Sequence, residues 1–142
     1  MEPALENILN LLLESERAGV AALDSIITRV ENDELRRLLI TSREDESATV
    51  QKLGRLMRTA GGIPSPHIGP FAAKINAEGK LSEQLKLLIR GEEWVARKIE
   101  ETLAIAPGSG PIRDYLQKMA RRHRFEVEWG RAELIRLMNA LG

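Results

Sequence analysis

The sequence contains no cysteine, and only 4% of its residues are aromatic. Disulfides, iron–sulfur clusters, thiolate zinc sites and cysteine nucleophiles are therefore excluded, and this composition is compatible with a reducing cytoplasm. Long apolar runs are missing too, since no stretch approaches the roughly 18 residues that a membrane span needs. The first residues, "MEPALEN", are acidic where a signal peptide is basic. We therefore expect a soluble, cytoplasmic protein with no membrane partner.

The chain also has no net charge, because 21 basic residues balance 21 acidic ones. No global field draws such a protein to nucleic acid or to anionic lipid. The one local basic excess is "KMARRHR", residues 118–124. We interpret it as a solvated helix face, because no aromatic platform or DNA-binding motif accompanies it. Nucleic acid is therefore not an expected partner.

Helix signals are present along most of the chain, whereas no stretch sustains the alternation of apolar and polar residues that is typical of strands. The 142 residues fit a single domain, residues 1–142. Pro3 and Pro111 suit the first turns of helices, and Asn32 and Ser82 are expected caps. Long helices are predicted over residues 3–30, 32–60, 82–106 and 111–141, with a short helical turn at 71–77.

The connections between these helices differ in length. The first and last are short, which predicts two antiparallel hairpins. The segment between the second and third helices begins with "GGIPSPHIGPF" and is long enough to run the length of a bundle. The predicted fold is therefore all-α: an antiparallel four-helix bundle with one long crossover between helices 2 and 3.

Each long helix carries an ionisable residue in the middle of its apolar stripe, where apolar side chains recur at alternating steps of three and four. The residues are Glu16, Glu46, Glu92 and His123, with Glu126 one turn beyond the histidine. Glu16 and Glu46 are equally far from the first turn, and Glu92 and His123 are about equally far from the last. We therefore expect these four side chains to lie at one height and to form one layer across the helices. Glu126 lies at the border of this layer if the helix keeps a period of 3.6 residues.

A single glutamate in such a stripe is more often paired with an arginine or extended toward solvent. Several carboxylates in one buried layer would repel one another and raise one another's pKa, whereas one or two divalent cations would supply the compensating charge. Together with an imidazole, this donor set suits iron, manganese or zinc. The sequence thus predicts a metal site with Glu16, Glu46, Glu92, His123 and Glu126 as candidate ligands.

This pattern resembles the ferritin-like di-metal carboxylate superfamily, which has a Glu on helix 1, Glu-x-x-His on helix 2, a Glu on helix 3 and Glu-x-x-His on helix 4. The stretches "LLLESERAG", "GGIPSPHIGPF" and "IRGEEWVARKI" look like those of an uncharacterised bacterial branch of it. The resemblance implies that Glu16, Glu46, Glu92 and His123 stand at metal-ligand positions. It also implies iron or manganese as the metal, with oxygen or peroxide as reactants.

Two positions depart from the superfamily pattern. Thr49 stands where the second helix would offer a histidine, and Ala120 stands where the fourth would offer a glutamate. Glu126 is a candidate to replace the missing carboxylate. One ion, two ions and none all remain open.

Two classes of function follow from the sequence. The first is a metal-binding protein with oxidase or peroxide-linked redox activity, such as ferroxidase-like oxidation of iron. The second is a metal-free helical bundle that acts as a structural or protein-interaction module. Trp94, Phe125 and Trp129 lie beside the apolar stripe and are candidates for a homodimer face. A hemerythrin-type oxygen carrier is excluded because His67 and His123 are the only histidines, and no catalytic residue is assigned.

Overall fold

The computed structural model describes residues 1–140 and contains no strand within that range, which confirms the all-α prediction. The helices are α1 (Pro3–Ile27), α2 (Asp33–Thr59), α3 (Phe71–Ala77), α4 (Leu81–Ile105), α5 (Pro111–Phe125) and α6 (Arg131–Ala140). A π-helical turn, η1 (Glu126–Gly130), joins α5 to α6.

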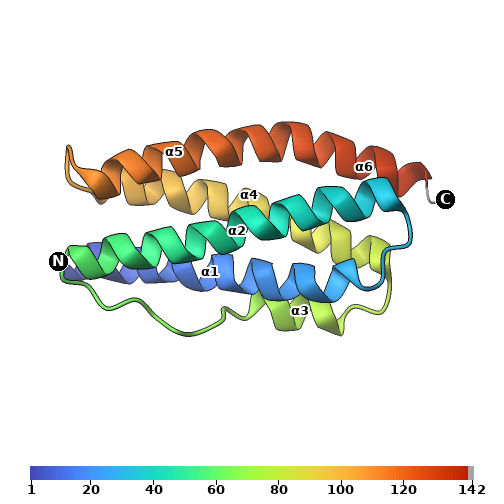
Figure 1. Cartoon of the computed structure of the whole chain (residues 1–142), viewed down its shortest axis with the longest axis horizontal. Helices are drawn as coiled ribbons and strands as arrows, with labels where there is room; N and C mark the ends of the chain where they lie inside the picture. The colour runs from blue at the N-terminus through green and yellow to red at the C-terminus, as the bar shows by residue number, and fades with distance from the viewer. Residues whose placement is uncertain (141–142) are drawn as a thin grey trace.

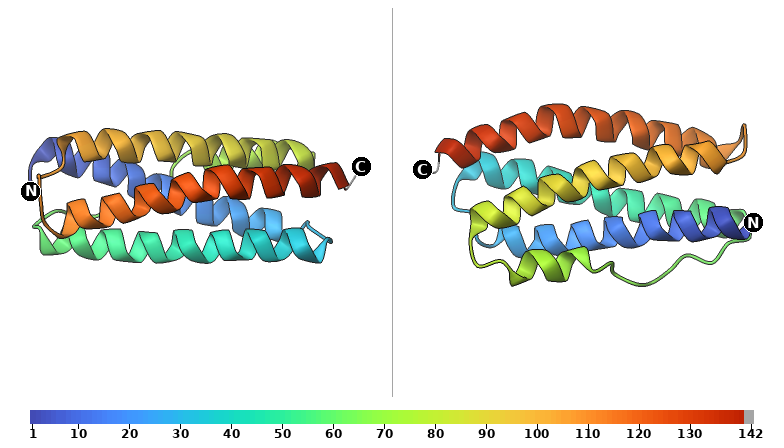
Figure 2. Two further views of the ribbon diagram at one scale, coloured as in Figure 1. Left: turned by 90° about the horizontal axis from the view of Figure 1, so that it is seen from above. Right: turned by 180° about the vertical axis from the view of Figure 1, so that it is seen from behind.

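The long helices lie side by side along the long axis of the molecule (Figure 1). Helix α1 contacts α2, α3 and α4, and α5 contacts both α2 and α4. Figure 2 shows that α5 and α6 follow each other along a single line from one end of the molecule to the other. The segment 60–70 extends along the outside of the molecule from the end of α2 to the start of α3 (Figure 1).

Most helix boundaries lie close to the turn signals of the sequence. The side chain of Asn32 accepts a hydrogen bond from the Leu35 amide at 2.8 Å and so caps α2 as predicted. Gly61, with φ +84°, adopts the left-handed conformation just after α2 ends. The prediction that Ser82 caps the next helix is wrong. Helix α4 begins one residue earlier, and the Lys80 carbonyl accepts from the amide of Gln84 at 3.1 Å.

The last predicted helix is not continuous. In a π turn each backbone bond spans five residues instead of four, so η1 rotates the side chains that follow it. The sequence does not show this interruption, because all five residues of η1 are compatible with a regular helix. The expected end near Leu141 lies outside the described residues.

Buried apolar residues form two clusters, one toward each end of the helices. The first includes Leu9, Leu12, Leu53, Ile99 and Leu116. The second includes Leu23, Ile26, Leu35, Leu85 and Leu134. On each long helix, the ionisable position lies between the residues of one cluster and those of the other.

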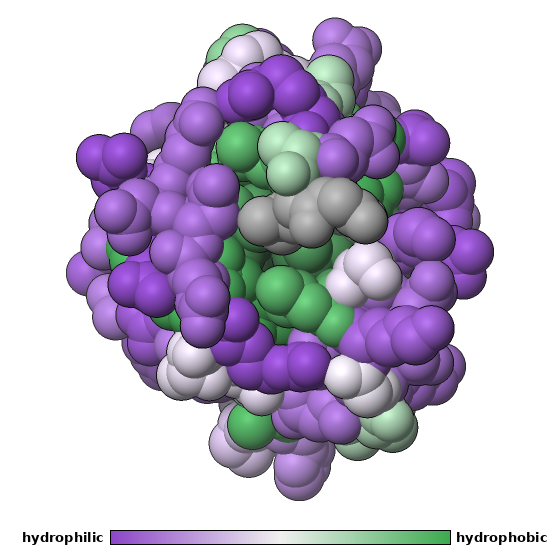
Figure 3. Space-filling view, turned by 90° about the vertical axis from the view of Figure 1, so that its right-hand side faces the viewer, coloured by the Kyte–Doolittle hydropathy of each residue, from purple (hydrophilic) through white to green (hydrophobic). Residues whose placement is uncertain are grey.

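Hydrophilic and apolar residues are both exposed at the end of the molecule where α1 turns into α2. Hydrophilic side chains ring a hollow in which apolar side chains are visible (Figure 3). Across residues 1–140, no helix is both long enough and apolar enough to cross a membrane.

Candidate metal centre

The structure brings all five predicted site residues together between the two apolar clusters. We call Glu16, Glu46, Glu92, His123 and Glu126 the acid layer. Glu16, Glu46 and His123 are 1%, 4% and 1% exposed, so burial is almost complete for these three. The side chains of Glu92 and Glu126 are 21% and 25% exposed, so these two carboxylates lie at the edge of the layer.

The imidazole of His123 lies between a carboxyl group of α1 and one of α4. Its Nε2 lies 3.2 Å from Glu16 Oε1 on α1, and its Nδ1 lies 3.6 Å from Glu92 Oε2 on α4. The first distance is that of a hydrogen bond, whereas the second is too long for one. If Nε2 carries the proton that Glu16 accepts, then Nδ1 keeps a free lone pair directed to the side of Glu92.

Glu92, His123 and Glu126 form the tightest donor group of the layer. One potential ligand atom from each lies within 4.8 Å of the other two. Two metal–ligand bonds of about 2.1 Å span at most roughly 4.2 Å, so small side-chain rotations would bring all three atoms onto one cation. Glu126, expected at the border of the layer, belongs to this group.

Glu46 is accommodated by a glycine on the neighbouring helix. A Cβ atom at Gly19 of α1 would overlap Oε2 and the carboxyl carbon of Glu46. Only a residue without a side chain leaves room for this carboxyl group. Nothing in the local sequence of α1 indicates that this glycine makes room for a side chain of α2.

The environment of the carboxyl groups disfavours negative charge. Burial, followed by the charge of Glu92 and then those of Glu16 and Glu126, raises the pKa of Glu46 well above its usual value. Burial and the charge of Glu92 raise the pKa of Glu126 to about 7, although His123 and Arg122 act in the opposite direction. Without a cation, Glu46 and Glu126 therefore keep their protons to a higher pH than ordinary glutamates do.

The neighbouring carboxylates also raise the pKa of the histidine. Burial alone lowers the pKa of His123, but the hydrogen bond and charge of Glu16, helped by Glu92 and Glu126, outweigh it. The net result is a pKa above the usual value for histidine. The protonated forms of His123, Glu46 and Glu126 are thus all favoured relative to their usual behaviour.

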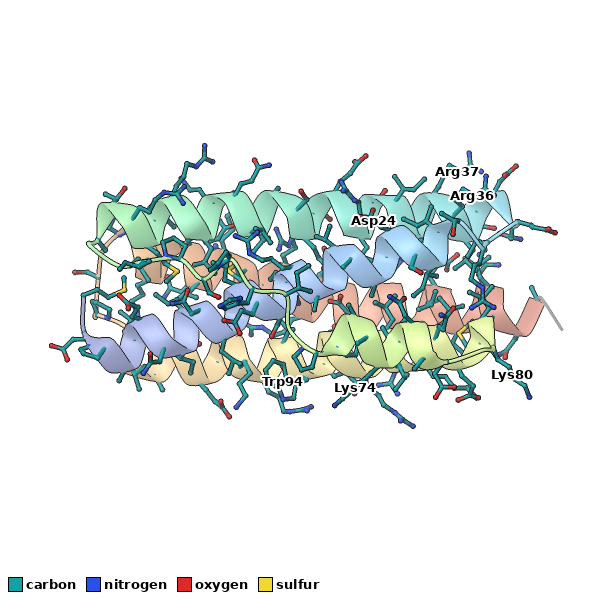
Figure 4. The ribbon with its side chains drawn as sticks, turned by 90° about the horizontal axis from the view of Figure 1, so that it is seen from below. Asp24, Arg36, Arg37, Lys74, Lys80 and Trp94 are labelled. Atoms are coloured by element: carbon teal, nitrogen blue, oxygen red, sulfur yellow. The ribbon has the colours of Figure 1, made fainter. Side chains whose placement is uncertain are left out.

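Four buried atoms of the layer that could bind a metal ion have no hydrogen-bond partner among the described residues. They are Glu16 Oε2, Glu46 Oε2, Glu92 Oε2 and His123 Nδ1. Buried polar atoms in folded proteins nearly always have a partner, so four together need an explanation. Arginine does not provide one, since within residues 1–140 none forms an ion pair with these three glutamates. Arg43, for example, pairs at 2.8 Å with Asp24, which is labelled in Figure 4.

Residues 4–133 match a domain of unknown function, DUF6306. The chain belongs to the DUF6306 family. The matched stretch includes every residue of the acid layer. None of the curated proteins matches the chain.

Arg122 is a residue of this DUF6306 chain that the sequence interpretation missed. Its neighbours in the basic run, Lys118, Arg121 and Arg124, are exposed as expected. Arg122 is half-buried instead, and its guanidinium donates a hydrogen bond to Thr49 Oγ1 and lies 3.7 Å from Glu126 Oε1. The available signal was its position one helical turn before Glu126.

The three aromatic residues near the stripe of the DUF6306 chain have different surroundings. Trp94 lies near the middle of α4 (Figure 4), is half-buried, and has the Lys98 ammonium 5.4 Å from its ring centre. Phe125 and Trp129 are exposed, and their rings stack with centres 6.0 Å apart. His67 is exposed in the segment 60–70, as expected of a loop residue.

Proposed function

We propose that the chain is a metal-binding protein of ferritin-like architecture, which holds iron or manganese in the acid layer. In this proposal the long helices form an antiparallel four-helix bundle, and the segment between α2 and α4 is its crossover. The observation that carries the proposal is the set of four buried donor atoms without hydrogen-bond partners. A divalent cation would satisfy such atoms and would also remove the cost of bringing the carboxylates together.

Each residue of the layer has a distinct role in this proposal. Glu92, His123 through Nδ1, and Glu126 would hold the ion, because their donor atoms already lie within 4.8 Å of one another. Glu46 would add a carboxylate from α2. Glu16 would position the imidazole by accepting the Nε2 proton, since metal-binding histidines usually donate their other N–H to a carboxylate or carbonyl.

We propose that the site takes one ion rather than two. The hydroxyl of Thr49 is engaged by Arg122 and by the Asp45 carbonyl, to which it donates at 3.0 Å, and Ala120 offers no donor. The guanidinium of Arg122 supplies a fixed positive charge beside Glu126. This charge replaces part of what a second cation would contribute.

Bound iron or manganese would supply electron exchange with oxygen or peroxide, so that a ferroxidase-like activity is the reaction we expect. The carboxylates would neutralise the ion, and the imidazole would tune its electron affinity. The two apolar clusters would limit the access of water from either end of the molecule.

The proposal is tested by measuring metal by mass spectrometry on protein purified without chelator and then reloaded with ferrous or manganous ion. About one ion per chain is expected. The Glu92→Gln variant should lose metal affinity by about tenfold or more, whereas Glu100→Gln, an exposed carboxylate on the same helix, should retain it. A wild-type chain that refuses both ions would overturn the proposal.

A metal-free interaction module is the second candidate, and the exposed Phe125–Trp129 stack is the observation that favours it. In that case two copies would associate through these rings, and the buried carboxyls would be protonated. Sedimentation of wild type and a Trp129→Ser variant decides between the candidates: loss of a dimer in the variant, with no metal bound in either, supports the module. The cytoplasmic location stays an expectation from the sequence.

A further inference from the structure

A cavity of about 330 Å³ lies between α2, α4 and the segment formed by α5, η1 and α6. Apolar side chains from all these elements line it, including Leu38, Leu39, Leu88, Phe125, Trp129 and Leu134. Three of these, Leu39, Leu88 and Leu134, belong to the buried core. The cavity is therefore an opening into the apolar interior rather than a depression in a polar surface.

The same cavity reaches the acid layer. Glu92 and Glu126 line it, as do Asp45 and Arg122. A molecule in the cavity would thus contact two of the residues that we propose to hold the metal ion. The exposed stack of Phe125 and Trp129 also forms part of its lining, which gives these two aromatic side chains a role within the single chain.

We propose that this cavity binds an uncharged, apolar organic molecule of roughly ten to twelve non-hydrogen atoms as the substrate beside the metal ion, an inference that rests on the proposed function. An apolar cavity of about 150 Å³ binds benzene, so about twice that volume suits a molecule of naphthalene size. Mostly apolar walls with a few convergent polar groups are the usual features of small-molecule sites.

Charge decides against an anionic ligand. Three carboxyl groups, those of Asp45, Glu92 and Glu126, line the cavity, and Arg122 already contacts Glu126 and Thr49. An anion would have to leave water for mostly apolar walls and, among the described residues that line the cavity, would find no cationic side chain free to pair with it, which costs free energy. A neutral ligand loses little on entering and gains the apolar contact area.

The test uses the full chain loaded with Mn²⁺, with 2-naphthol as the neutral probe and 2-naphthoate as its anionic counterpart. Calorimetry should show one 2-naphthol bound per chain, with 2-naphthoate at least about tenfold weaker. Paramagnetic relaxation by Mn²⁺ should broaden the proton signals of bound 2-naphthol, because the cavity borders Glu92 and Glu126.

Variants locate the binding site. Ser42 lines the cavity from α2, so Ser42→Phe should fill it and abolish 2-naphthol binding without loss of metal. Ala48→Phe adds the same side chain to an exposed position of α2 that does not line the cavity, and binding should persist. If Ser42→Phe does not fold, Ile89→Trp fills the cavity from α4 and should have the same effect.

The outcomes separate this inference from the proposed function. Metal uptake without 2-naphthol binding, equal binding in the filled variants, or equal binding of 2-naphthoate overturns the inference and leaves the metal site standing. Binding of 2-naphthol to a chain that takes up no metal overturns the proposed function, and with it the role of the cavity as a substrate site.

Discussion

Two buried polar groups of this molecule differ in whether their hydrogen-bonding atoms have partners. Gln84 on α4 is buried, and both ends of its amide are engaged: Nε2 donates to the Ile75 carbonyl at 3.1 Å, and Oε1 accepts from Arg29 Nη1 at 2.5 Å. In the acid layer, by contrast, four donor atoms have no partner among the described residues.

The comparison shows how structural and functional polar groups can be told apart. Gln84 joins α4 to α3 and to the turn that follows α1, through one neutral hydrogen bond and one to a charged group, and so stabilises their packing. In the acid layer, folding disfavours the ionised form of Glu46 and Glu126, since burial raises the pKa of both carboxyl groups. A group that weakens the fold and has no partner inside it points to a ligand from outside.

The largest expected effect comes from removing the satisfied group. Gln84→Ala should lower the free energy of unfolding by about 2–3 kcal/mol, because it leaves the Ile75 carbonyl and Nη1 of Arg29 without their partner. Gln117→Ala, at an exposed position of α5, should change it by less than about 0.5 kcal/mol. In metal-free protein at neutral pH, Glu46→Gln should instead leave stability unchanged or increased.

Urea denaturation in the presence of a chelator measures all three variants. A loss for Glu46→Gln as large as that for Gln84→Ala would show that both groups serve the fold, and the distinction between them would fail.

A somewhat smaller effect is expected from a methyl group added at Gly19, which faces Glu46. Gly19→Ala should cost about 1–3 kcal/mol, because the added methyl group overlaps the carboxyl of Glu46. Gly79→Ala is the matched control, since a Cβ there meets no described atom within 4 Å. Combining Gly19→Ala with Glu46→Ala should relieve most of the penalty in a double-mutant cycle. If the losses of the two single variants simply added in the double variant, the cost of Gly19→Ala would not come from contact with Glu46.

The pH dependence of metal-free protein should distinguish the acid layer from ordinary surface carboxylates. The pKa of Glu126 is raised from 4.5 to about 7 in the folded chain, so the folded state binds more protons than the unfolded state between these values. Stability should therefore be highest at the acidic end of this window and fall as pH rises through 7, and the raised pKa of His123 acts in the same direction.

Melting temperatures in chelator between pH 5 and about pH 8 test this sign. The decline should be shallower in Glu126→Gln and unchanged in Glu128→Gln, an exposed carboxylate of the same turn. A wild-type curve that rises with pH across the window would contradict the account of the layer.

The smallest expected effect concerns the arginine beside the layer. The positive charge of Arg122 opposes the raised pKa of Glu126, so Arg122→Gln should move the decline in stability to higher pH. The change in stability itself should stay below about 1 kcal/mol, because the pair is partly exposed and 3.7 Å apart. Arg124→Gln, at an exposed position, should leave the pH profile unchanged.

Sequence periodicity was sufficient to find the helices and to select the five residues of the acid layer. It worked because a helix places every third or fourth residue on one face, so a charged residue at such a position interrupts a visible stripe. Counting from the turns then predicted that Glu16 and Glu46 lie at one height. Whether these residues bind metal stays a prediction, as does the assignment of residues 1–142 to a single domain.

The features that the sequence did not reveal depend on contacts between helices. The room that Gly19 leaves for Glu46, and the hydrogen bond of Arg122 to Thr49, join residues of different helices and leave no local pattern. The π turn η1 is similar, since tertiary packing rather than composition decides where a helix gains an extra residue. The cap assigned to Ser82 was wrong because the helix begins one residue before that serine.

Pulsed electron paramagnetic resonance of the chain loaded with Mn²⁺ tests the central claim most directly, because it detects nitrogen bound to the ion. We predict one tightly bound ion per chain whose echo is modulated by a single imidazole nitrogen, with this modulation lost in His123→Gln and retained in His67→Gln. Failure to bind Mn²⁺ stoichiometrically, or binding with no nitrogen modulation, would contradict the claim that Glu92, His123 and Glu126 share a cation.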